Sequence, residues 1–529
     1  MTVGIILVAF VIFLCIVADR FSDKFGMPAL ILFMFIGMLF GSDGILKIPF
    51  NDYKIAEDFC SIALLFIMFY GGFNTKWKLA KNVAVKSVLL STLGVLITAG
   101  VTAVLCHIFL KFSITESFLV GAVLSSTDAA SVFSILRQKK LNLKDGTASL
   151  LEMESGSNDP VSYMLTIIGI GLLNSGEKGN LFYSIFAQVV YGCAIGVLFA
   201  FAAIWLLTKS NLVAEGLDTI FMIATVLLCY GFSSYVGGNA YLSIYLMGIM
   251  IGNSRIKNKN VLIPFFDGIT GLAQIFLFFL LGLLAFPHKL PAIILPALVI
   301  VFFLTFIARP LAVFIILKPL KCSNKQCLLV SWAGLRGAAS IVFAIMVIAS
   351  GSKLTSDLFH IVFMVALFSV AIQGTLLPTV ASKLNMVDET SDVRKTFNDY
   401  QEESALTLMR MFIPERHNWE NQLIKNVTMP TGSLALMIKR KKETIIPRGD
   451  TKILAGDSVI LSVPAYEPAE HEKLEEIQID SKHSWCNHSI EELQMPPNEL
   501  IALIIRGEEN LIPDGKTVIL ENDIVVAYR

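Results

Sequence analysis

Hydrophobic residues along the first 385 positions of the chain are gathered into long stretches, which short polar segments separate. A transmembrane α-helix needs roughly 17 to 25 such residues. We count thirteen stretches of about this length. Their approximate limits are 2–19, 27–42, 58–73, 84–110, 116–136, 148–173, 181–207, 215–236, 238–253, 262–287, 291–317, 327–350 and 357–382. The pattern predicts an all-α polytopic membrane domain over residues 1–385, with about 13 transmembrane helices.

Charged residues become much denser after the last hydrophobic stretch. Residues 387–529 hold 16 Lys or Arg and 25 Asp or Glu, nearly half of the charged residues of the whole chain. A soluble part therefore follows the membrane part. The net charge of the chain is zero, so no concentrated basic surface is expected for nucleic acid. The eight cysteines are scattered, and we interpret them as small buried hydrophobic residues.

The distribution of Lys and Arg among the loops predicts the orientation, because cytoplasmic loops retain these residues. If the N-terminus is outside, the inner loops hold 17 of them and the outer loops hold six. An odd number of spans then places the C-terminal tail in the cytoplasm. We expect a multi-pass protein of the cell inner membrane. No basic residue precedes the long first stretch, so a cleaved signal peptide is not expected.

Polar and ionisable side chains cluster inside four of the hydrophobic stretches. A charge at bilayer depth is costly, so it is usually paired, faces an aqueous cavity or serves transport. The clusters are Ser125-Ser126-Thr127-Asp128 in the fifth stretch, Glu152, Glu154 and Ser155-Gly156-Ser157-Asn158-Asp159-Pro160 in the sixth, Arg309 in the eleventh, and Gly334-Leu335-Arg336-Gly337 in the twelfth.

The residues of the sixth stretch favour cation chemistry. Glu154 and Asn158 are four residues apart and share a helix face, as do Glu152 and Asp159, which are seven apart. Pro160 removes a backbone donor and frees carbonyl groups in the preceding turn. Hydroxyl, amide, carbonyl and carboxylate oxygens are hard ligands that suit alkali cations. Because a partly desolvated carboxylate can hold a proton near neutral pH, proton and cation can compete for one oxygen pair. This competition indicates exchange.

A structural interpretation of the same charges is that acids and arginines join helices as buried ion pairs. We favour it for Glu154, with Arg309 or Arg336 as the partner. For Asp159 and Asp128 we favour a functional role, because two arginines cannot neutralise every acid of the cluster. Two further acids are weaker candidates, Glu152 and Asp267.

These clusters resemble the motifs of monovalent cation:proton antiporters of the NhaP and NHE type, in the family's order and over essentially all of residues 1–385. The matching segments are Ser125 to Asp128, Glu154 to Pro160, Ala308-Arg309-Pro310 and Gly334 to Gly337. The resemblance implies a thirteen-helix fold of inverted repeats, in which unwound helices cross near Thr127-Asp128 and within the twelfth stretch. It also implies a homodimer in the lipid bilayer.

The same resemblance implies roles for individual residues. Asp159 is then the site shared by the proton and the cation, and Asn158 and Thr127 assist it. Asp128 and Ser155 contribute to the cation site, while Glu154 pairs with an arginine.

Two details bear on the cation and on the stoichiometry. Ala129 stands where many NhaP members have proline, and this form resembles the potassium/proton subgroup. Asn158 stands where electrogenic relatives carry a second aspartate, so an electroneutral one-for-one cycle is expected. The Ala129 variant makes potassium the predicted cation, and sodium is the alternative.

The tail contains an internal repeat. A linker helix is expected over residues 386–403. Beyond it, His417-Asn418-Trp419 aligns with His483-Ser484-Trp485, and Asp457 with Asp523, at an offset of 66 residues and without a gap. Such a match indicates duplicated structural units, which we bound at 404–466 and 467–529.

Each unit of the repeat resembles the TrkA-C (RCK-C) regulatory domain, which implies a tandem α+β tail. No Gly-x-Gly-x-x-Gly phosphate loop follows a strand, so a nucleotide-binding Rossmann module is not expected. In some relatives this domain binds a cyclic dinucleotide such as cyclic di-AMP, which makes a nucleotide the candidate regulator. No cofactor is expected.

Two functions of other classes fit the sequence less well. A cation channel gated by the tail would need a filter such as Thr-Val-Gly-Tyr-Gly, which the chain lacks. A membrane-embedded hydrolase using His360 would need an arrangement such as HExxH or GxSxG, and neither occurs. We therefore expect a transporter and not an enzyme.

Overall fold

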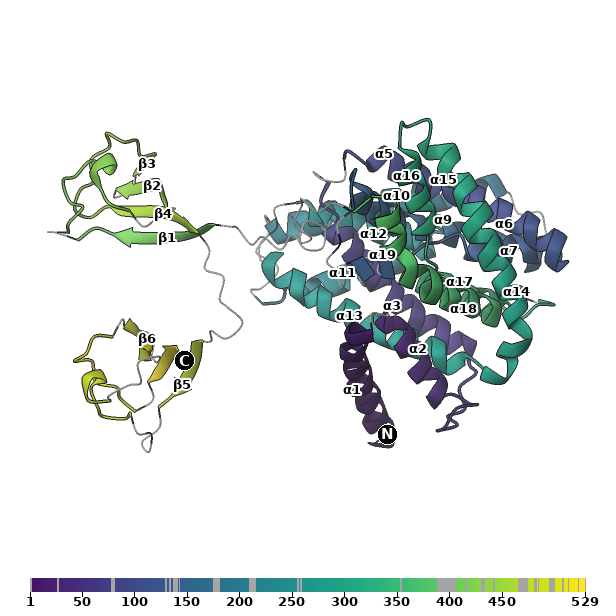
Figure 1. Cartoon of the computed structure of the whole chain (residues 1–529), viewed down its shortest axis with the longest axis horizontal. Helices are drawn as coiled ribbons and strands as arrows, with labels where there is room; N and C mark the ends of the chain where they lie inside the picture. Colours follow the sequence, from purple (N-terminus) through teal and green to yellow (C-terminus); the bar gives the residue numbers. More distant parts are fainter. Residues whose placement is uncertain are drawn as a thin grey trace. The chain divides into compact units, whose positions relative to one another are not determined.

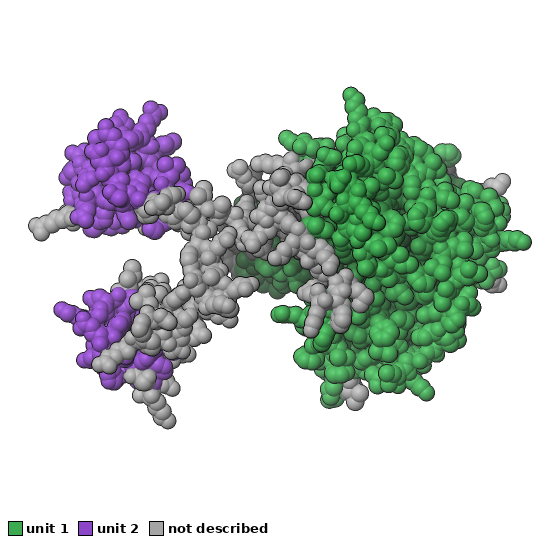
Figure 2. All heavy atoms as spheres, viewed as in Figure 1, with its two compact units in different colours: residues 1–401 green, residues 402–529 purple. Residues whose placement is uncertain are grey.

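The structure, a computed structural model, is shown in Figure 1. It describes residues 2–25, 28–77, 81–128, 131–132, 135–136, 141, 143–174, 181–208, 216–254, 256, 259–352, 354–387, 406–414, 417–429, 433–440, 443–464, 474–479, 483, 485–493, 500–506, 509–511, 513–521 and 523–528. The chain divides into two compact units, residues 1–401 and 402–529 (Figure 2).

One group of packed helices, here called the first bundle, forms part of the membrane unit. Its helices are α1 (Thr2–Phe25), α2 (Ala29–Phe40), α3 (Tyr53–Asn74), α10 (Leu181–Thr208), α11 (Asp218–Tyr235), α12 (Ala240–Gly252) and α13 (Lys259–Leu284). Small residues let these helices approach closely, as is common in membranes. Gly37 of α2 and Gly282 of α13 are an example, because a Cβ atom on either would clash with the backbone of the other helix.

The remaining described helices of the membrane unit pack mainly against one another and are here called the second bundle. They are α5 (Ala84–Leu89), α6 (Val95–Leu110), α7 (Ile114–Val123), α9 (Thr147–Asn174), α14 (Leu290–Phe303), α15 (Arg309–Leu317), α16 (Asn324–Trp332), α17 (Ala338–Ala349), α18 (Leu358–Phe368) and α19 (Thr375–Lys383). The two bundles meet where α9 and α17 pack against α3 and α12.

Three π-helical turns interrupt long helices of the second bundle. These are η1 (Leu90–Gly94) between α5 and α6, η3 (Leu304–Ala308) between α14 and α15, and η4 (Ser369–Gly374) between α18 and α19. Such turns inside α-helices are frequent at functional sites. Pro310, which follows η3, lacks a backbone N–H and so removes one helical hydrogen bond.

Two breaks in helical structure meet inside the second bundle. The chain is non-helical from Leu124 to Asp128 after α7, and from Ala333 to Gly337 between α16 and α17. The N–H of Asp128 donates to the carbonyl of Leu335 at 2.8 Å. A Cβ atom at Gly337 would clash with the Asp128 carboxyl group, so only glycine permits this approach. The two breaks therefore cross at Asp128.

Eight helical runs of the described residues are long and apolar enough to cross a membrane, and four shorter apolar helices accompany them. The helical membrane domain agrees with the prediction from hydrophobic stretches, while the count of thirteen crossings stays a prediction. The predicted linker helix at 386–403 lies outside the described residues, apart from Met386 and Val387.

The described part of the tail contains two four-stranded antiparallel sheets. The first has the order β1-β4-β2-β3, from β1 (Leu406–Phe412), β2 (Leu434–Arg440), β3 (Glu443–Ile445) and β4 (Ser458–Pro464). The second has the order β5-β8-β6-β7, from β5 (Leu474–Gln478), β6 (Leu500–Arg506), β7 (Glu509–Leu511) and β8 (Ile524–Tyr528). The order of strands is the same in both.

The register of the two sheets repeats at the offset seen in the sequence. Phe412 pairs with Ser458 in the first sheet, and Gln478 pairs with Ile524 in the second. A register shift interrupts β2 between Ala435 and Met437 and β6 between Ile501 and Leu503. The sequence repeat is thus a structural repeat. Regular structure in the described tail consists of these strands and two 3₁₀ turns, so the α+β class stays a prediction.

Candidate ion-binding site

Asp159 lies in the middle of α9, and its side chain is almost completely buried, with 8% exposed. Its carboxylate accepts a hydrogen bond from the Ser126 hydroxyl, which belongs to the non-helical segment after α7. Among the described residues, no arginine, lysine or histidine forms an ion pair with it. Among the described residues, this carboxylate therefore has a neutral hydrogen-bond donor and no fixed cation.

Oxygen atoms of the same segment and of α9 surround this position. The Ser155 hydroxyl donates to the backbone carbonyl of Thr127. Asn158 Nδ2 donates to Thr127 Oγ1 at 2.5 Å, while Asn158 Oδ1 is buried and accepts no hydrogen bond from the residues that the structure describes. A buried acceptor without a donor is unfavourable unless a ligand or water uses it. The arrangement therefore offers an amide oxygen to a cation.

Asp128 lies where the two helix breaks cross. Its Oδ2 accepts a hydrogen bond from Ser131 Oγ at 2.6 Å, and it lies near enough to Asp159 for the two charges to interact. The structure thus brings together the five residues that the sequence nominated for the cation site, which are Asp159, Asn158, Asp128, Thr127 and Ser155.

Glu154 lies one turn before Asn158 on α9, and its surroundings differ from those of Asp159. Both of its oxygens meet the guanidinium of Arg309, with Nη1–Oε1 at 2.6 Å and Nη2–Oε2 at 2.8 Å. The two side chains are 1% and 3% exposed. Of the two arginines that the sequence left open as partner, the structure places Arg309 against Glu154. This bidentate pair fixes α9 to α15.

Arg336 instead supports the helix break after α7. Its Nη1 donates to the backbone carbonyl of Ser126 at 2.7 Å, so it holds the residue whose hydroxyl contacts Asp159. The backbone N–H of Arg336 donates to Ser369 Oγ at 3.0 Å. Arg336 is therefore joined to both the non-helical segment and η4.

A chain of polar side chains that sequence reasoning missed continues from this point. Ser369 Oγ donates to Gln373 Oε1 at 2.5 Å, and Gln373 Nε2 donates to Thr305 Oγ1 at 2.8 Å. The only signal in the sequence is that each is a polar residue within an apolar stretch. Together with Ser126, the side chains of Ser369, Gln373 and Thr305 support the ion-binding residues from outside.

A small cavity of ≈ 10 Å³ lies between the two arginines. It is lined by Thr305, Arg309, Ser331, Arg336, Ser369 and Gln373, among others. Arg309 Nε is buried there without a hydrogen-bond partner among the described residues. A cavity needs roughly 10 to 15 Å³ on this measure to hold one water molecule. The space thus suits a single water that accepts from Arg309.

Three other residues that the sequence analysis names lie outside the cluster around Asp159 or are less buried than Asp159. Glu152 is half-buried on α9, and Asp267 is exposed on α13 of the first bundle. His360 is buried near the start of α18, where it contacts Asp357. Within the described residues, no group of three or more His, Cys, Asp or Glu side chains could hold a metal ion.

Comparison with protein families gives two matches. The family described as "Sodium/hydrogen exchanger, transmembrane" matches residues 7–383, which include every residue of the site. The TrkA-C domain family matches residues 474–528, the second repeat of the tail.

Individual proteins are similar over most of the chain. A protein of Alkalimonas amylolytica named K(+)/H(+) antiporter NhaP is 34% identical over 469 residues, covering 86% of this chain and 80% of that protein. The K(+)/H(+) antiporter NhaP2 of Shewanella baltica is 32% identical over 442 residues, covering 82% and 76%. The solved sodium proton antiporter MjNhaP1 of Methanocaldococcus jannaschii has the same fold, with a TM-score of 0.64 over 72% of this chain and 99% of that chain, at 23% identity.

Proposed function

The chain belongs to the transmembrane sodium/hydrogen exchanger family, and we propose that it exchanges a monovalent cation for protons across the cell inner membrane. Potassium is the proposed cation, because the similar proteins of Alkalimonas and Shewanella are named K(+)/H(+) antiporters and because of the Ala129 variant. Sodium is the second candidate, supported by the name of the structural neighbour.

The observation that carries the proposal is the buried carboxylate of Asp159, which no described cationic side chain neutralises. An isolated buried charge is costly, so this carboxylate gains from either a proton or a cation. The oxygens of Asn158, Thr127, Ser155 and Asp128 complete a set of hard ligands around the cation. A proton and a cation bind the same oxygen pair, so each displaces the other.

Glu154 and Arg309 take no part in this competition in the proposed mechanism. Their bidentate pair already compensates both charges, and it is buried on all sides. Arg336 acts through Ser126, whose carbonyl it holds. The proposed cycle therefore moves one cation against one proton at Asp159 and carries no net charge.

Alternating access in this proposal is a movement of the second bundle, which contains the complete site, against the first bundle. Few polar contacts of the described residues cross the boundary near the site. Asn239 Nδ2 of the first bundle donates to the Pro160 carbonyl at 2.7 Å, and Ser157 Oγ meets the Tyr245 hydroxyl at 3.3 Å. Contacts of this number and strength can be exchanged between two states.

The tail is proposed as a cytoplasmic regulator that consists of two TrkA-C-like domains, at 404–466 and 467–529. The family match to the second repeat and the shared strand order of both repeats support this proposal. A cyclic dinucleotide such as cyclic di-AMP is the proposed ligand class. The N-terminus is proposed to lie outside, and the protein to act as a homodimer.

Exchange by the purified protein in liposomes tests the proposed function. A pH-sensitive dye inside the vesicles reports proton movement when K⁺, Na⁺ or Li⁺ is added outside. The proposal predicts cation-dependent proton movement with K⁺ the most effective ion. Proton movement that does not depend on any of the three cations would refute it, and a stronger response to Na⁺ would favour the second candidate.

A further inference from the structure

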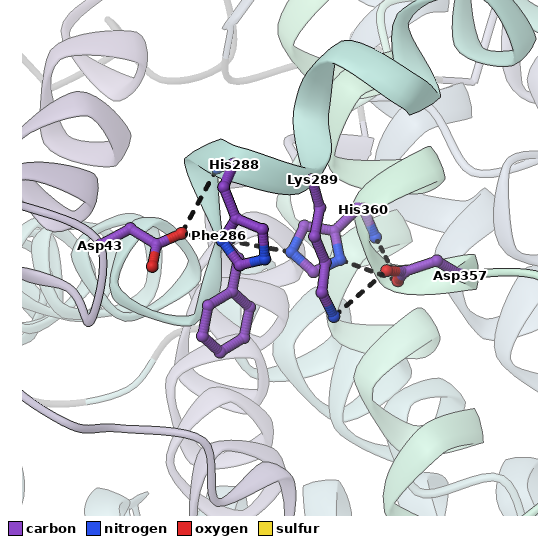
Figure 3. Close-up of polar contacts among 6 residues, drawn as sticks. All are labelled: Asp43, Phe286, His288, Lys289, Asp357 and His360. Carbon is purple, nitrogen blue, oxygen red and sulfur yellow. Dashed lines mark hydrogen bonds and ion pairs between the residues drawn. The ribbon is translucent and has the colours of Figure 1, made fainter.

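His360 lies in the first turn of α18 and is completely buried. Figure 3 shows its ring between two partners from different segments. On one side Nδ1 lies 2.8 Å from Oδ1 of Asp357, the N-cap residue of the same helix. On the other side Nε2 accepts a hydrogen bond of 3.0 Å from the backbone N–H of Phe286. The ring therefore joins α18 to the segment that precedes η2 (Pro287–Lys289).

These two partners fix the protonation of the ring. A backbone N–H can only donate, so Nε2 must present its lone pair to Phe286. Nδ1 then carries the proton and donates it to the Asp357 carboxylate. The ring in this structure is the neutral Nδ1–H tautomer. A second proton can bind only at Nε2, where it would remove the acceptor of the Phe286 bond and place two N–H groups against each other.

Two charged groups lie beside the ring or beside its partner. The Asp357 carboxylate contacts Nδ1 of the ring. Lys289 Nζ, 3.8 Å from Asp357 Oδ2, partly compensates that carboxylate. From α3, Tyr53 packs its ring on Phe359, beside His360, and is near enough to interact with the charge of Asp357.

The segment that His360 holds is a linker between the two bundles, because it connects α13 of the first bundle to α14 of the second. The opposite side of this linker is held by Asp43, which follows α2 of the first bundle. Asp43 Oδ2 accepts from the backbone N–H of His288 at 3.3 Å and also contacts the His288 ring (Figure 3). Asp43 from the first bundle and His360 from the second thus hold one short linker between them.

The position of this cluster in the membrane follows from the chain. Residues Leu358–Lys383 form one run that is long and apolar enough to cross a membrane. Asp357 and His360 lie at its N-terminal end, so they face the side of the membrane opposite to Lys383.

We propose that His360 is a second proton-binding site, at the membrane face opposite to the C-terminal end of α19 and separate from Asp159, and that proton binding there breaks the hydrogen bond between α18 and the inter-bundle linker. Among the polar contacts of the described residues, those of Asp43 with His288 and the ion pair of Lys289 with Asp357 would then still hold the linker. In this way the pH at that face controls a contact between the linker and the second bundle. The inference does not depend on which residue carries the exchanged cation.

Hydrogen–deuterium exchange of the Phe286 amide in the full-length protein tests this inference. Protection is measured relative to an unstructured peptide, at about pH 8 and about pH 5.5, which bracket the ordinary titration range of histidine. In the wild type we expect protection to fall about tenfold at the lower pH, the ratio that corresponds to the loss of one hydrogen bond of ordinary strength.

Three variants make the result specific. His360→Gln keeps an amide oxygen that can accept from Phe286 but does not titrate, so protection should stay high at both pH values. His360→Phe has no acceptor, so protection should be low at both. His107→Gln removes an exposed histidine of α6 and should behave as the wild type. The inference is overturned if protection in the wild type does not change, or if His360→Gln loses protection as the wild type does.

The same measurement in an Asp159→Asn background separates the two proposals of this article. The pH-dependent protection of Phe286 should persist in this variant even when exchange is abolished. Loss of the pH dependence in that background would show that the proton is bound at Asp159 and not at His360.

Discussion

Arg309 and Glu154 are joined by two short N–O contacts, of 2.6 and 2.8 Å, and both are almost completely removed from solvent. Replacing one partner of a buried pair leaves the other charge uncompensated, which typically costs about 3 to 5 kcal/mol. We therefore expect Arg309→Met to lower the stability of the protein in detergent by about this amount. Arg309→Lys, which keeps the charge but loses the bidentate geometry, should be intermediate.

The thermal transition of the purified variants measures this effect. If Arg309→Met unfolds at the same temperature as the wild type, the pair has no structural role. A variant that is stable but has lost cation binding would instead place Glu154 in the transport site.

Ser126 is expected to tune the affinity of the cation site, because its hydroxyl donates to Asp159. A hydrogen bond to a carboxylate favours the ionised form, which is the form that binds a cation. Ser126→Ala should therefore raise the apparent KM for the cation, by about tenfold if the bond is of ordinary strength. Ser126→Thr keeps the hydroxyl and is the matched control. Equal KM values in Ser126→Ala and the wild type would remove Ser126 from the site.

Asn158 is the basis of the predicted electroneutral cycle. Because Asn158 contributes no titrating group, we expect each turnover to move one cation against one proton at Asp159. Current measurements on solid-supported membranes should show no net charge movement for the wild type. Asn158→Asp adds a further carboxylate directly before Asp159 and should introduce a current. A current in the wild type at each turnover would contradict the one-for-one cycle.

The two repeats of the tail contain the same arginine–aspartate pair. Arg506 contacts both oxygens of Asp523, at 2.9 and 2.7 Å, as Arg440 contacts those of Asp457. The hydrogen bonds from Arg506 hold the pKa of Asp523 below its ordinary value. A carboxyl group with a lowered pKa stabilises the folded state above its unfolded pKa of about 3.9, and this stabilisation is lost as the pH falls through the lower, folded pKa.

Arg506→Ala should therefore destabilise the second repeat at neutral pH by roughly 2 kcal/mol, the usual value for hydrogen bonds to a charged group. It should also lose less stability than the wild type on acidification. Hydrogen exchange of β8 in the full-length protein measures both effects, and Arg440→Ala should leave β8 unchanged. An effect of Arg506→Ala that is equally large at acid and neutral pH would exclude the Asp523 charge as its cause.

Much of the membrane fold could be predicted from continuous hydrophobic stretches. The stretch predicted at 148–173 is the helix Thr147–Asn174, and that at 181–207 is Leu181–Thr208. These limits are sharp because polar residues bound each stretch in the sequence. The fifth stretch, predicted at 116–136, contains a helix that ends at Val123. Hydropathy does not detect this end, because the non-helical residues that follow are buried by another helix break.

The family resemblance, inferred from short motifs, and the TrkA-C identity of the second repeat are confirmed by the family comparisons. The TrkA-C identity of the first repeat stays a prediction. The support of the site could not be predicted in the same way. Gln373 and Thr305 are 68 positions apart and meet only because η3 and η4 lie together. The sequence also does not predict that Arg506 pairs with Asp523, although the repeat places Asp457 and Asp523 in equivalent positions.

The central claim is that one carboxylate, Asp159, holds either the proton or the cation. Asp159→Asn keeps the size of the side chain and removes its charge, so proton movement driven by K⁺ or Na⁺ in liposomes should be abolished while the protein stays folded. Asp267→Asn, which changes an exposed acid of the first bundle, should retain exchange. Cation-dependent exchange that persists in a folded Asp159→Asn protein would contradict the account.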